Sequence, residues 1–166
     1  MKSLIVYYSY TGNTQKVAEA LKGILSKKGE VDIFALEPED ESDSFFMQCV
    51  RAFRKKRASL KAMPPDVSGY DLICLGNPVW AFAPVPAMNT YIDSLKDLTG
   101  KEALCFITYG SGTGADRCLD TMDAELKKKG ASKVGNFKVQ QGEVKDKDLV
   151  EKKIRDKMPE NMYNTG

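Results

Sequence analysis

The sequence predicts an α/β fold in which a parallel β-sheet is covered on both faces by helices. Strand-like apolar runs alternate with helix-like segments of about 10 to 20 residues, which is the pattern of successive β-α-β units. The first run is continuously apolar, as expected for a strand buried on both faces. With 166 residues, 42% of them hydrophobic, the chain is long enough for one domain with a substantial core.

Five strands are expected, at residues 2–8, 31–36, 71–76, 103–109 and 134–139. The first is rich in apolar and β-branched residues, and the third and fourth are similar buried runs. The fifth alternates apolar and polar side chains, so we expect it at an edge of the sheet.

Five helices are expected, at residues 13–28, 42–61, 86–98, 113–129 and 146–158. Each carries apolar residues on or near one face, and glycine or proline follows each within a few positions. With no linker or internal repeat in view, we expect one domain over residues 1–158 and a C-terminal tail over residues 159–166.

Composition excludes several classes of function. The net charge of +2 is too small to imply nucleic-acid binding. No segment approaches the ~20 apolar residues that span a bilayer, so no membrane partner is expected. The apolar run at residues 4–8 is too short for a signal peptide. We therefore expect a cytoplasmic protein.

Few side chains are available for acid–base or metal chemistry. Histidine is absent, which removes His-based triads and His-ligated metal sites. Cys49, Cys74, Cys105 and Cys118 show no C-x-x-C spacing, and Cys74 and Cys105 lie within apolar runs as buried thiols would. The chemistry is therefore expected to belong to a bound cofactor.

A basic run, Arg51-x-x-Arg54-Lys55-Lys56-Arg57, lies on the second predicted helix. A solvated helix face is the simpler interpretation. A docking patch for an acidic partner or an anionic dinucleotide is the alternative.

Three loops follow the carboxyl ends of predicted strands, where open parallel sheets bind ligands. Residues 9–14 are rich in hydroxyls, contain no Lys or Arg, and lead into a helix, so neutral dipoles there could hold an anion. Residues 76–84 carry the single tryptophan, Trp80, between Pro78 and Pro84. Residues 108–114 are glycine-rich, which lets a planar ligand approach the backbone closely.

Two common nucleotide-binding motifs are absent, and each of the three loops also has a purely structural interpretation. The Walker pattern G-x-x-x-x-G-K-[ST] is absent, and no G-x-G-x-x-G follows the first strand. Residues 9–14 could merely cap a helix. Trp80 could be a packing anchor, and Tyr109 could equally pack at the strand end or contact a ligand.

The first loop and its flanks resemble the flavodoxin signature. The match covers residues 5–21 and includes every defined position, namely Ile5, Val6, Tyr7, Ser9, Gly12, Thr14, Ala18 and Leu21. Trp80 follows Gly76 by four residues, where many flavodoxins place an aromatic ring that stacks on FMN. The resemblance implies a flavodoxin-like doubly wound five-stranded parallel sheet of order 2-1-3-4-5, with FMN where the strand order reverses.

The resemblance also implies a set of FMN-binding residues. Ser9, Thr11, Asn13 and Thr14, with the amides of residues 10–14, would hold the phosphate. Trp80 would cover one face of the isoalloxazine ring. The backbone of residues 77–81 would pass its N5 edge, and residues 108–112 would border its pyrimidine edge and second face. The complete expected set is Ser9, Tyr10, Thr11, Gly12, Asn13, Thr14, Asn77, Pro78, Val79, Trp80, Ala81, Phe82, Thr108, Tyr109, Gly110, Ser111 and Gly112.

The chain departs from flavodoxins in three respects. Ala81 stands where they commonly have Gly, and a left-handed backbone costs an Ala roughly 1 kcal/mol, so a weakly stabilised neutral semiquinone is expected. Residues 81–86 are apolar where flavodoxins carry acids, which implies a less negative hydroquinone potential and a shelf for a quinone, a nicotinamide or a partner protein. Gly114 stands where a second stacking Tyr is common, which would leave one flavin face open.

The expected function is that of an FMN-binding electron-transfer protein. The alternative is an NAD(P)H-dependent FMN or quinone reductase on the same fold, favoured by the apolar loop and opposed by the small size and the missing dinucleotide motif. A flavin-free binding module is a third class. The expected partner is a redox protein or a small-molecule acceptor, and a monomer is expected, with a homodimer left open.

Overall fold

The computed structural model describes residues 1–39 and 57–158. They form one parallel sheet with the expected order β2-β1-β3-β4-β5. The strands are β1 (Lys2–Tyr7), β2 (Glu30–Ala35), β3 (Leu72–Pro78), β4 (Glu102–Tyr109) and β5 (Lys133–Gln140). The prediction of an edge position for the fifth strand is confirmed.

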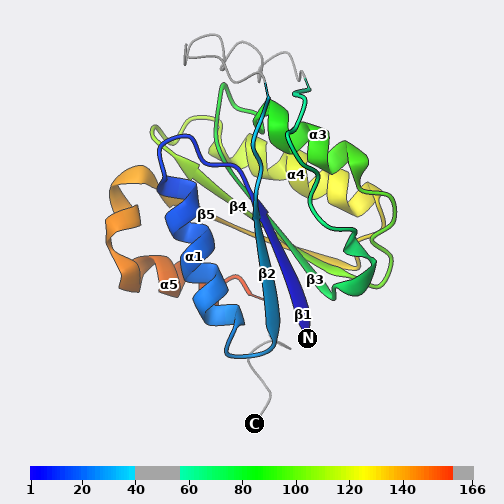
Figure 1. Cartoon of the computed structure of the whole chain (residues 1–166). Coiled ribbons are helices and arrows are strands. Elements are labelled where there is room, and N and C mark those ends of the chain that lie inside the picture. Colours follow the sequence, from blue (N-terminus) through cyan, green and yellow to red (C-terminus); the bar gives the residue numbers. More distant parts are fainter. Residues whose placement is uncertain (40–56, 159–166) are drawn as a thin grey trace.

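The described helices cover both faces of this sheet (Figure 1). One face packs against α1 (Asn13–Leu25) and α5 (Lys147–Arg155), and the other against α3 (Pro86–Ser94) and α4 (Ala115–Lys128). Short 3-10 helices precede β3 (Val67–Gly69) and α5 (Gln141–Lys145). The doubly wound architecture predicted from the alternating pattern is therefore present.

Two hydrophobic layers hold the sheet between the helices. On the α1 and α5 side, the rings of Phe106 and Phe137 stack with centroids 5.5 Å apart. A Cβ on Gly76 would lie 2.1 Å from Phe106 Cζ, so only glycine fits beneath this ring. Close packing of β3 on Phe106 thus fixes the backbone just before the loop that carries Trp80.

The predicted helix at residues 42–61 lies outside the described residues except at its end, and there it is wrong. Residues 57–61 are not helical, because their backbone groups pair elsewhere. Leu60 forms an antiparallel bridge with Pro38, and the Lys61 N–H donates to the Glu37 carbonyl at 2.9 Å. Thr90 Oγ1 contacts both the N–H and the carbonyl of Ala58. These partners satisfy the backbone without a helix.

Of the basic run, only Arg57 lies among the described residues, and it forms an ion pair with Asp93. The predicted tail, residues 159–166, lies outside them, as does Cys49.

Most element ends differ from the predictions by a few residues, and the differences at β3, α3 and α5 have visible causes. β3 continues through Asn77 and Pro78, where Pro78 pairs with Thr108, so the following loop begins later than expected. α3 ends at Ser94 instead of residue 98, because Leu95 adopts an extended backbone with ψ of 126°. α5 is shorter than predicted: Asp146 is its N-cap and accepts the Leu149 N–H, and the helix ends at Arg155 with Asp156 as its C-cap.

The thiols behave as the sequence predicted. Cys74, Cys105 and Cys118 are buried and unbridged. Burial raises the pKa of the Cys118 thiol to about 12, and it raises the pKa of Cys74 and Cys105 as well. These three groups are therefore unreactive core side chains. Separately, none of the helices described in residues 1–39 and 57–158 is both long and apolar enough to cross a bilayer.

Candidate functional site

Three loops leave the carboxyl ends of β1, β3 and β4 at the same edge of the sheet, at the top of Figure 1. They are the first loop (residues 8–12), the second loop (residues 79–85) and the third loop (residues 110–114). A buried contact joins the elements around the first and third loops, because Thr14 Oγ1 and Thr108 Oγ1 lie 2.8 Å apart. The structure thus brings the beginning of α1 against the end of β4.

The first loop brings hydroxyl oxygens and backbone amides together at the beginning of α1. Gly12 has φ of 82° and is the N-cap of α1, so the capping residue itself has no side chain to bond the first turn. Ser9 Oγ accepts the Gln15 N–H at 3.2 Å, and Thr11 Oγ1 accepts Asn13 Nδ2 at 3.1 Å. Because both hydroxyl oxygens act as acceptors, their own O–H groups remain donors for another molecule. The helix end adds the positive end of its dipole.

Thr14 plays a different part from the other hydroxyl residues. Its side chain is 1% exposed, and its hydroxyl is engaged with Thr108. The side chain therefore joins two elements of the fold, and only the backbone N–H of Thr14 remains as a candidate anion donor.

The second loop contains a tight turn with an unusual backbone. Trp80 and Ala83 exchange both backbone hydrogen bonds, at 3.2 and 3.0 Å. The two central residues have positive φ, 46° at Ala81 and 67° at Phe82. Ala81 thus adopts the left-handed backbone despite its Cβ, and a conformation of this kind at a non-glycine residue costs about 1–3 kcal/mol.

The Trp80 side chain is buried and makes T-shaped contacts with two tyrosine rings. It is 3% exposed, and the rings of Tyr8 and Tyr10 approach it edge-on, with centroids 5.5 and 5.7 Å away. In this conformation the indole is part of the core on the α3 and α4 side. The sequence analysis missed the part played by Tyr8, although its place at the end of an apolar strand is visible in the sequence.

Phe82 is the exposed aromatic residue of the second loop. It is 41% exposed, and its ring lies on Gly114, the N-cap of α4. A Cβ on Gly114 would lie 1.8 Å from Phe82 Cδ1, so glycine is required for this contact. The sequence predicted an open flavin face because Gly114 replaces a stacking Tyr, and that prediction stays untested; the Phe82 ring at this glycine comes from another loop, which no local signal could reveal.

Asn77 and Pro78 belong to β3 instead of the loop. The Asn77 side chain is fully buried, accepts the Val85 N–H at 3.0 Å, and points its amide toward Met122 Sδ at 3.5 Å. The Asn77 side chain therefore joins the end of β3, where the second loop begins, to Val85, where that loop ends. The N–H of Val79 donates to the Thr108 carbonyl at 2.9 Å, which continues the β3–β4 pairing.

The third loop is the most exposed of the three. Gly110, Ser111 and Gly112 are exposed and Tyr109 is half-buried. Gln140 Nε2 donates to the Gly110 carbonyl at 3.2 Å, which anchors this loop to the end of β5.

A cavity of about 270 Å³ adjoins the first loop on the β2 side. Tyr8, Ser9 and Gln15 form one wall, and Lys61 lies at its boundary, 3.3 Å from Glu37 Oε2. By contrast, the three loops themselves contain no Asp, Glu, Lys or Arg. An anion held there would meet neutral donors and a helix dipole, which suits a phosphate monoester on an otherwise apolar ligand.

Comparisons with known proteins agree with this architecture. The family model described as flavodoxin matches residues 2–160. The comparison with curated proteins gives no match.

Solved structures share the fold at low sequence identity. A flavoprotein from Lactobacillus acidophilus NCFM, solved in complex with FMN, has a TM-score of 0.67 and 22% identity, over 89% of this chain and 98% of the other. Flavodoxin 2 from Bacillus cereus has a TM-score of 0.60 and 19% identity, over 92% and 94%. The apo form of an NADH:FMN oxidoreductase has a TM-score of 0.62 and 15% identity, over 94% and 88%.

Proposed function

Because the chain belongs to the flavodoxin family, we propose that it binds FMN between the three loops and transfers electrons. Family membership supports FMN as the cofactor, and the neutral hydroxyl loop suits its phosphate. When bound, FMN supplies redox chemistry in one- or two-electron steps, and the protein binds and orients it.

The first loop carries the proposal. Neither the Ser9 nor the Thr11 hydroxyl donates in the hydrogen bonds described above, and among the described residues only the Gln15 N–H of the first turn of α1 has a side-chain acceptor, which leaves the Asn13 and Thr14 amides for a ligand. Uncapped amides at a helix N-terminus bind phosphate well. The residues proposed to bind FMN are those expected from the sequence. The side chains of Thr14 and Asn77 would contribute indirectly, since they bond Thr108 and Val85 and thereby position the loops.

The aromatic residues would border the ring system. Phe82 is exposed beside Gly114, whereas Trp80 lies between Tyr8 and Tyr10. Their contribution is to exclude water and to fix the orientation of a planar ligand by apolar contact.

FMN titration of the apoprotein tests the proposal, with flavin fluorescence as the readout. Thr11→Val removes one hydroxyl donor and should weaken FMN binding about tenfold or more, the range for a hydrogen bond to a charged group. Thr121→Val is the matched control, since Thr121 lies half-buried on α4 and, among the described residues, its hydroxyl donates only to the Arg117 carbonyl of its own helix. Purified protein that is colourless and takes up no FMN would instead favour a flavin-free binding module.

An NAD(P)H-dependent reductase of FMN or quinones is the second candidate. The exposed Phe82 and the uncharged second loop favour it, because they could receive a nicotinamide or quinone ring. Steady-state oxidation of NADH and NADPH with a quinone acceptor separates the two functions. Many turnovers per second would identify a reductase, and no oxidation without an added reductase would identify a carrier that serves a redox partner protein.

The proposal includes a cytoplasmic location and a monomer. The unbridged Cys74, Cys105 and Cys118 are consistent with this location, since structural disulfides are rare in the cytosol.

A further inference from the structure

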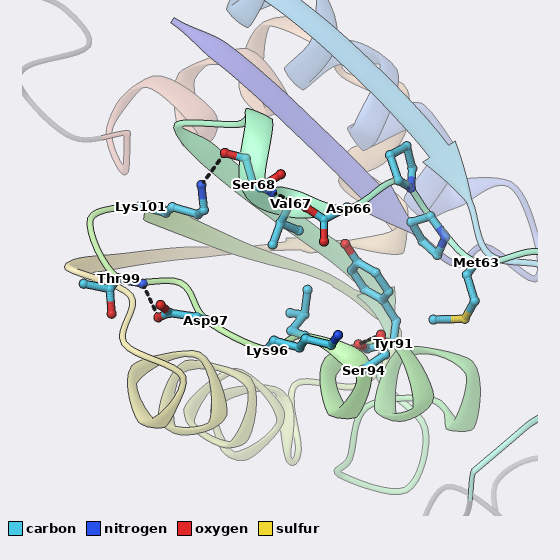
Figure 2. Close-up of a pocket in the computed structure, with 13 residues that line it drawn as sticks. Met63, Asp66, Val67, Ser68, Tyr91, Ser94, Lys96, Asp97, Thr99 and Lys101 are labelled. Carbon is cyan, nitrogen blue, oxygen red and sulfur yellow. Dashed lines mark hydrogen bonds between the residues drawn. The ribbon is translucent and has the colours of Figure 1, made fainter.

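A cleft of about 540 Å³, shown in Figure 2, is lined by segments at the amino ends of β3 and β4. The loops of the proposed FMN site lie at the carboxyl ends of these strands. One wall is the segment of residues 63–68 that leads into β3. The other is the end of α3 with the segment of residues 95–101 that leads into β4. The cleft is therefore built from connections at the amino ends of the strands, and the volume is that of a small-molecule site.

Tyr91 of α3 places an unpartnered polar group in this cleft. Its side chain is 2% exposed, and its hydroxyl has no hydrogen-bond partner among the described residues. Figure 2 shows the ring rising from α3 toward the segment that contains Asp66 and Val67. A buried hydroxyl without a partner carries a free-energy penalty, which a ligand with a suitable atom would relieve.

The surroundings of the Tyr91 hydroxyl determine whether a ligand must offer it a hydrogen-bond donor or an acceptor. Burial, together with the nearby Tyr70 and Asp66, raises the pKa of the Tyr91 hydroxyl well above its usual value. The group therefore stays protonated and offers an O–H donor, which calls for an acceptor oxygen on the ligand.

The charges around the cleft balance one another. Lys96 and Lys101 are opposed by Asp66 and Asp97. Lys101 Nζ already donates to the carbonyls of Ser68 and Tyr70, at 3.1 and 2.8 Å. A cleft with two charges of each sign gives little preference to an ion.

The rest of the lining includes the polar residues Ser68, Ser94 and Thr99 and one continuous apolar wall. Met63, Pro64 and Pro65 form one wall, with Val67 and Leu95 further in. Because the Tyr91 oxygen is itself buried, a ligand reaches it only when a wall residue moves. Met63 is 50% exposed and has a flexible side chain, so it is the residue best suited to move aside.

We propose that this cleft binds a small neutral molecule that has an apolar ring and a carbonyl oxygen, with the oxygen accepting the Tyr91 O–H. The ring packs against the Met63–Pro65 wall. The site is separate from the FMN site and does not depend on the proposed function.

Three ligands of nearly equal size test the preferred charge of the ligand and its need for an acceptor oxygen. Benzamide is neutral and has a carbonyl oxygen, benzoate is an anion with acceptor oxygens, and benzamidine is a cation without one. Each is titrated into the FMN-loaded protein, and the shifts of backbone amide NMR signals at residues 63–69 and 94–101 are followed. Benzamide should bind at least about fivefold more tightly than either ion, since neither ion gains from a cleft of balanced charge.

Tyr91→Phe removes only the hydroxyl, and it should weaken benzamide binding about five- to tenfold, the effect of losing one hydrogen bond. The variant should fold, because the hydroxyl that it loses has no partner. Tyr70→Phe is the matched control: its hydroxyl donates to Asp32 Oδ2 at 2.8 Å and is not part of the cleft, so it should leave benzamide binding unchanged. Equal binding of all three probes, no shifts in these segments, or full benzamide affinity in Tyr91→Phe would overturn the proposal.

Discussion

Gly114 is the residue at which the second and third loops meet. It combines two constraints that favour glycine, a φ of 82° and the Phe82 ring where a Cβ would be. Phe82 itself has positive φ, so the contact on Gly114 helps to hold a turn that its own residues disfavour. A single glycine therefore supports the aromatic edge of the proposed cofactor site.

Gly114→Ala should lower the free energy of unfolding by about 2–4 kcal/mol, through left-handed strain and overlap with Phe82. Gly100→Ala is the control, since Gly100 has φ of 77° and nothing within 4 Å of the new Cβ. It should cost only about 1–2 kcal/mol. Urea unfolding of the apoproteins measures both values. Adding Phe82→Ala to Gly114→Ala should recover the difference, and a purely additive result would contradict the contact.

Trp80 has a structural contribution besides its proposed contact with FMN. Trp80→Ala should weaken FMN binding by about 1–3 kcal/mol, through lost aromatic burial. Since Trp80 is 3% exposed between Tyr8 and Tyr10, the variant should also destabilise the apoprotein by about 3–5 kcal/mol. FMN titration and thermal unfolding of the same preparation measure the two effects. An unchanged FMN dissociation constant would remove Trp80 from the site.

Asp123 makes stability depend on pH. It is 8% exposed on α4, Oδ2 accepts Asn136 Nδ2 at 2.5 Å, and Oδ1 has no partner among the described residues. Burial raises the pKa of this carboxyl, and this effect outweighs the lowering of the pKa by the Asn136 hydrogen bond and by the nearby Cys105 thiol and Lys127. The folded state therefore holds the proton more tightly than the unfolded chain. The resulting stabilisation is complete below about pH 4 and is lost as pH rises through the raised pKa.

Asp123→Asn removes this titration while keeping the shape of the side chain. At pH 7 the variant should be at least as stable as the parent protein, and its advantage should shrink as pH falls toward about 4. Urea unfolding of the apoproteins at several pH values measures the difference. A difference that does not change with pH would exclude Asp123 as its source.

Among the elements, the contact between α1 and β4 is the one that joins two parts of the proposed site. Thr14 and Thr108 are both buried, at 1% exposure each, and their hydroxyls have one another as partners. Replacing one of them by valine leaves the other hydroxyl buried without that partner.

Thr14→Val and Thr108→Val should each destabilise the apoprotein by about 1–3 kcal/mol, whereas the double variant should cost less than the sum of the two. Denaturant unfolding of the four proteins completes the double-mutant cycle. FMN titration of the double variant then reports whether the contact itself matters for the cofactor. Strictly additive destabilisation would show that the two hydroxyls act independently.

Elements specified by local patterns were predictable from the sequence, whereas elements specified by distant contacts were not. The strand, loop and helix at the N-terminus were predictable, because an apolar run, Gly12 and the stripe of Val17 and Leu21 are all local signals. The helical prediction failed at residues 57–61, because pairing of Leu60 with Pro38 depends on residues distant in sequence.

Long-range contacts also explain what was missed within the site. The covering of Gly114 by Phe82 and the contact of Thr14 with Thr108 join residues from separate loops and elements. The burial of Asn77 follows from its place inside β3, whereas the predicted strand ended at residue 76 and placed Asn77 in the following loop. Local patterns thus identified the three loops, while the contacts between them required the structure.

At the scale of the whole molecule, charge should have little influence on encounters with redox partners. The net charge is +2, and the three loops of the proposed site carry no charged side chain. Long-range steering is therefore weak.

Reoxidation of the FMN-loaded, reduced protein by ferricyanide should change less than about threefold between low and physiological ionic strength, since steering by strong fields changes such rates far more. Stopped-flow absorbance at matched pH measures the rate. A change of about tenfold or more would indicate a strong local field and a partner surface of opposite charge.

The strand order also determines when, during synthesis, the protein can acquire its cofactor. β1 pairs early with β2, but its other neighbour, β3, begins only at Leu72. The third loop and α4 come later still, and only then do all three loops exist together. A ribosome adds about 5–20 residues per second, so the edge of β1 waits a few seconds for β3. If all three loops are needed to bind FMN, as proposed, the nascent chain would capture it only after α4 has emerged.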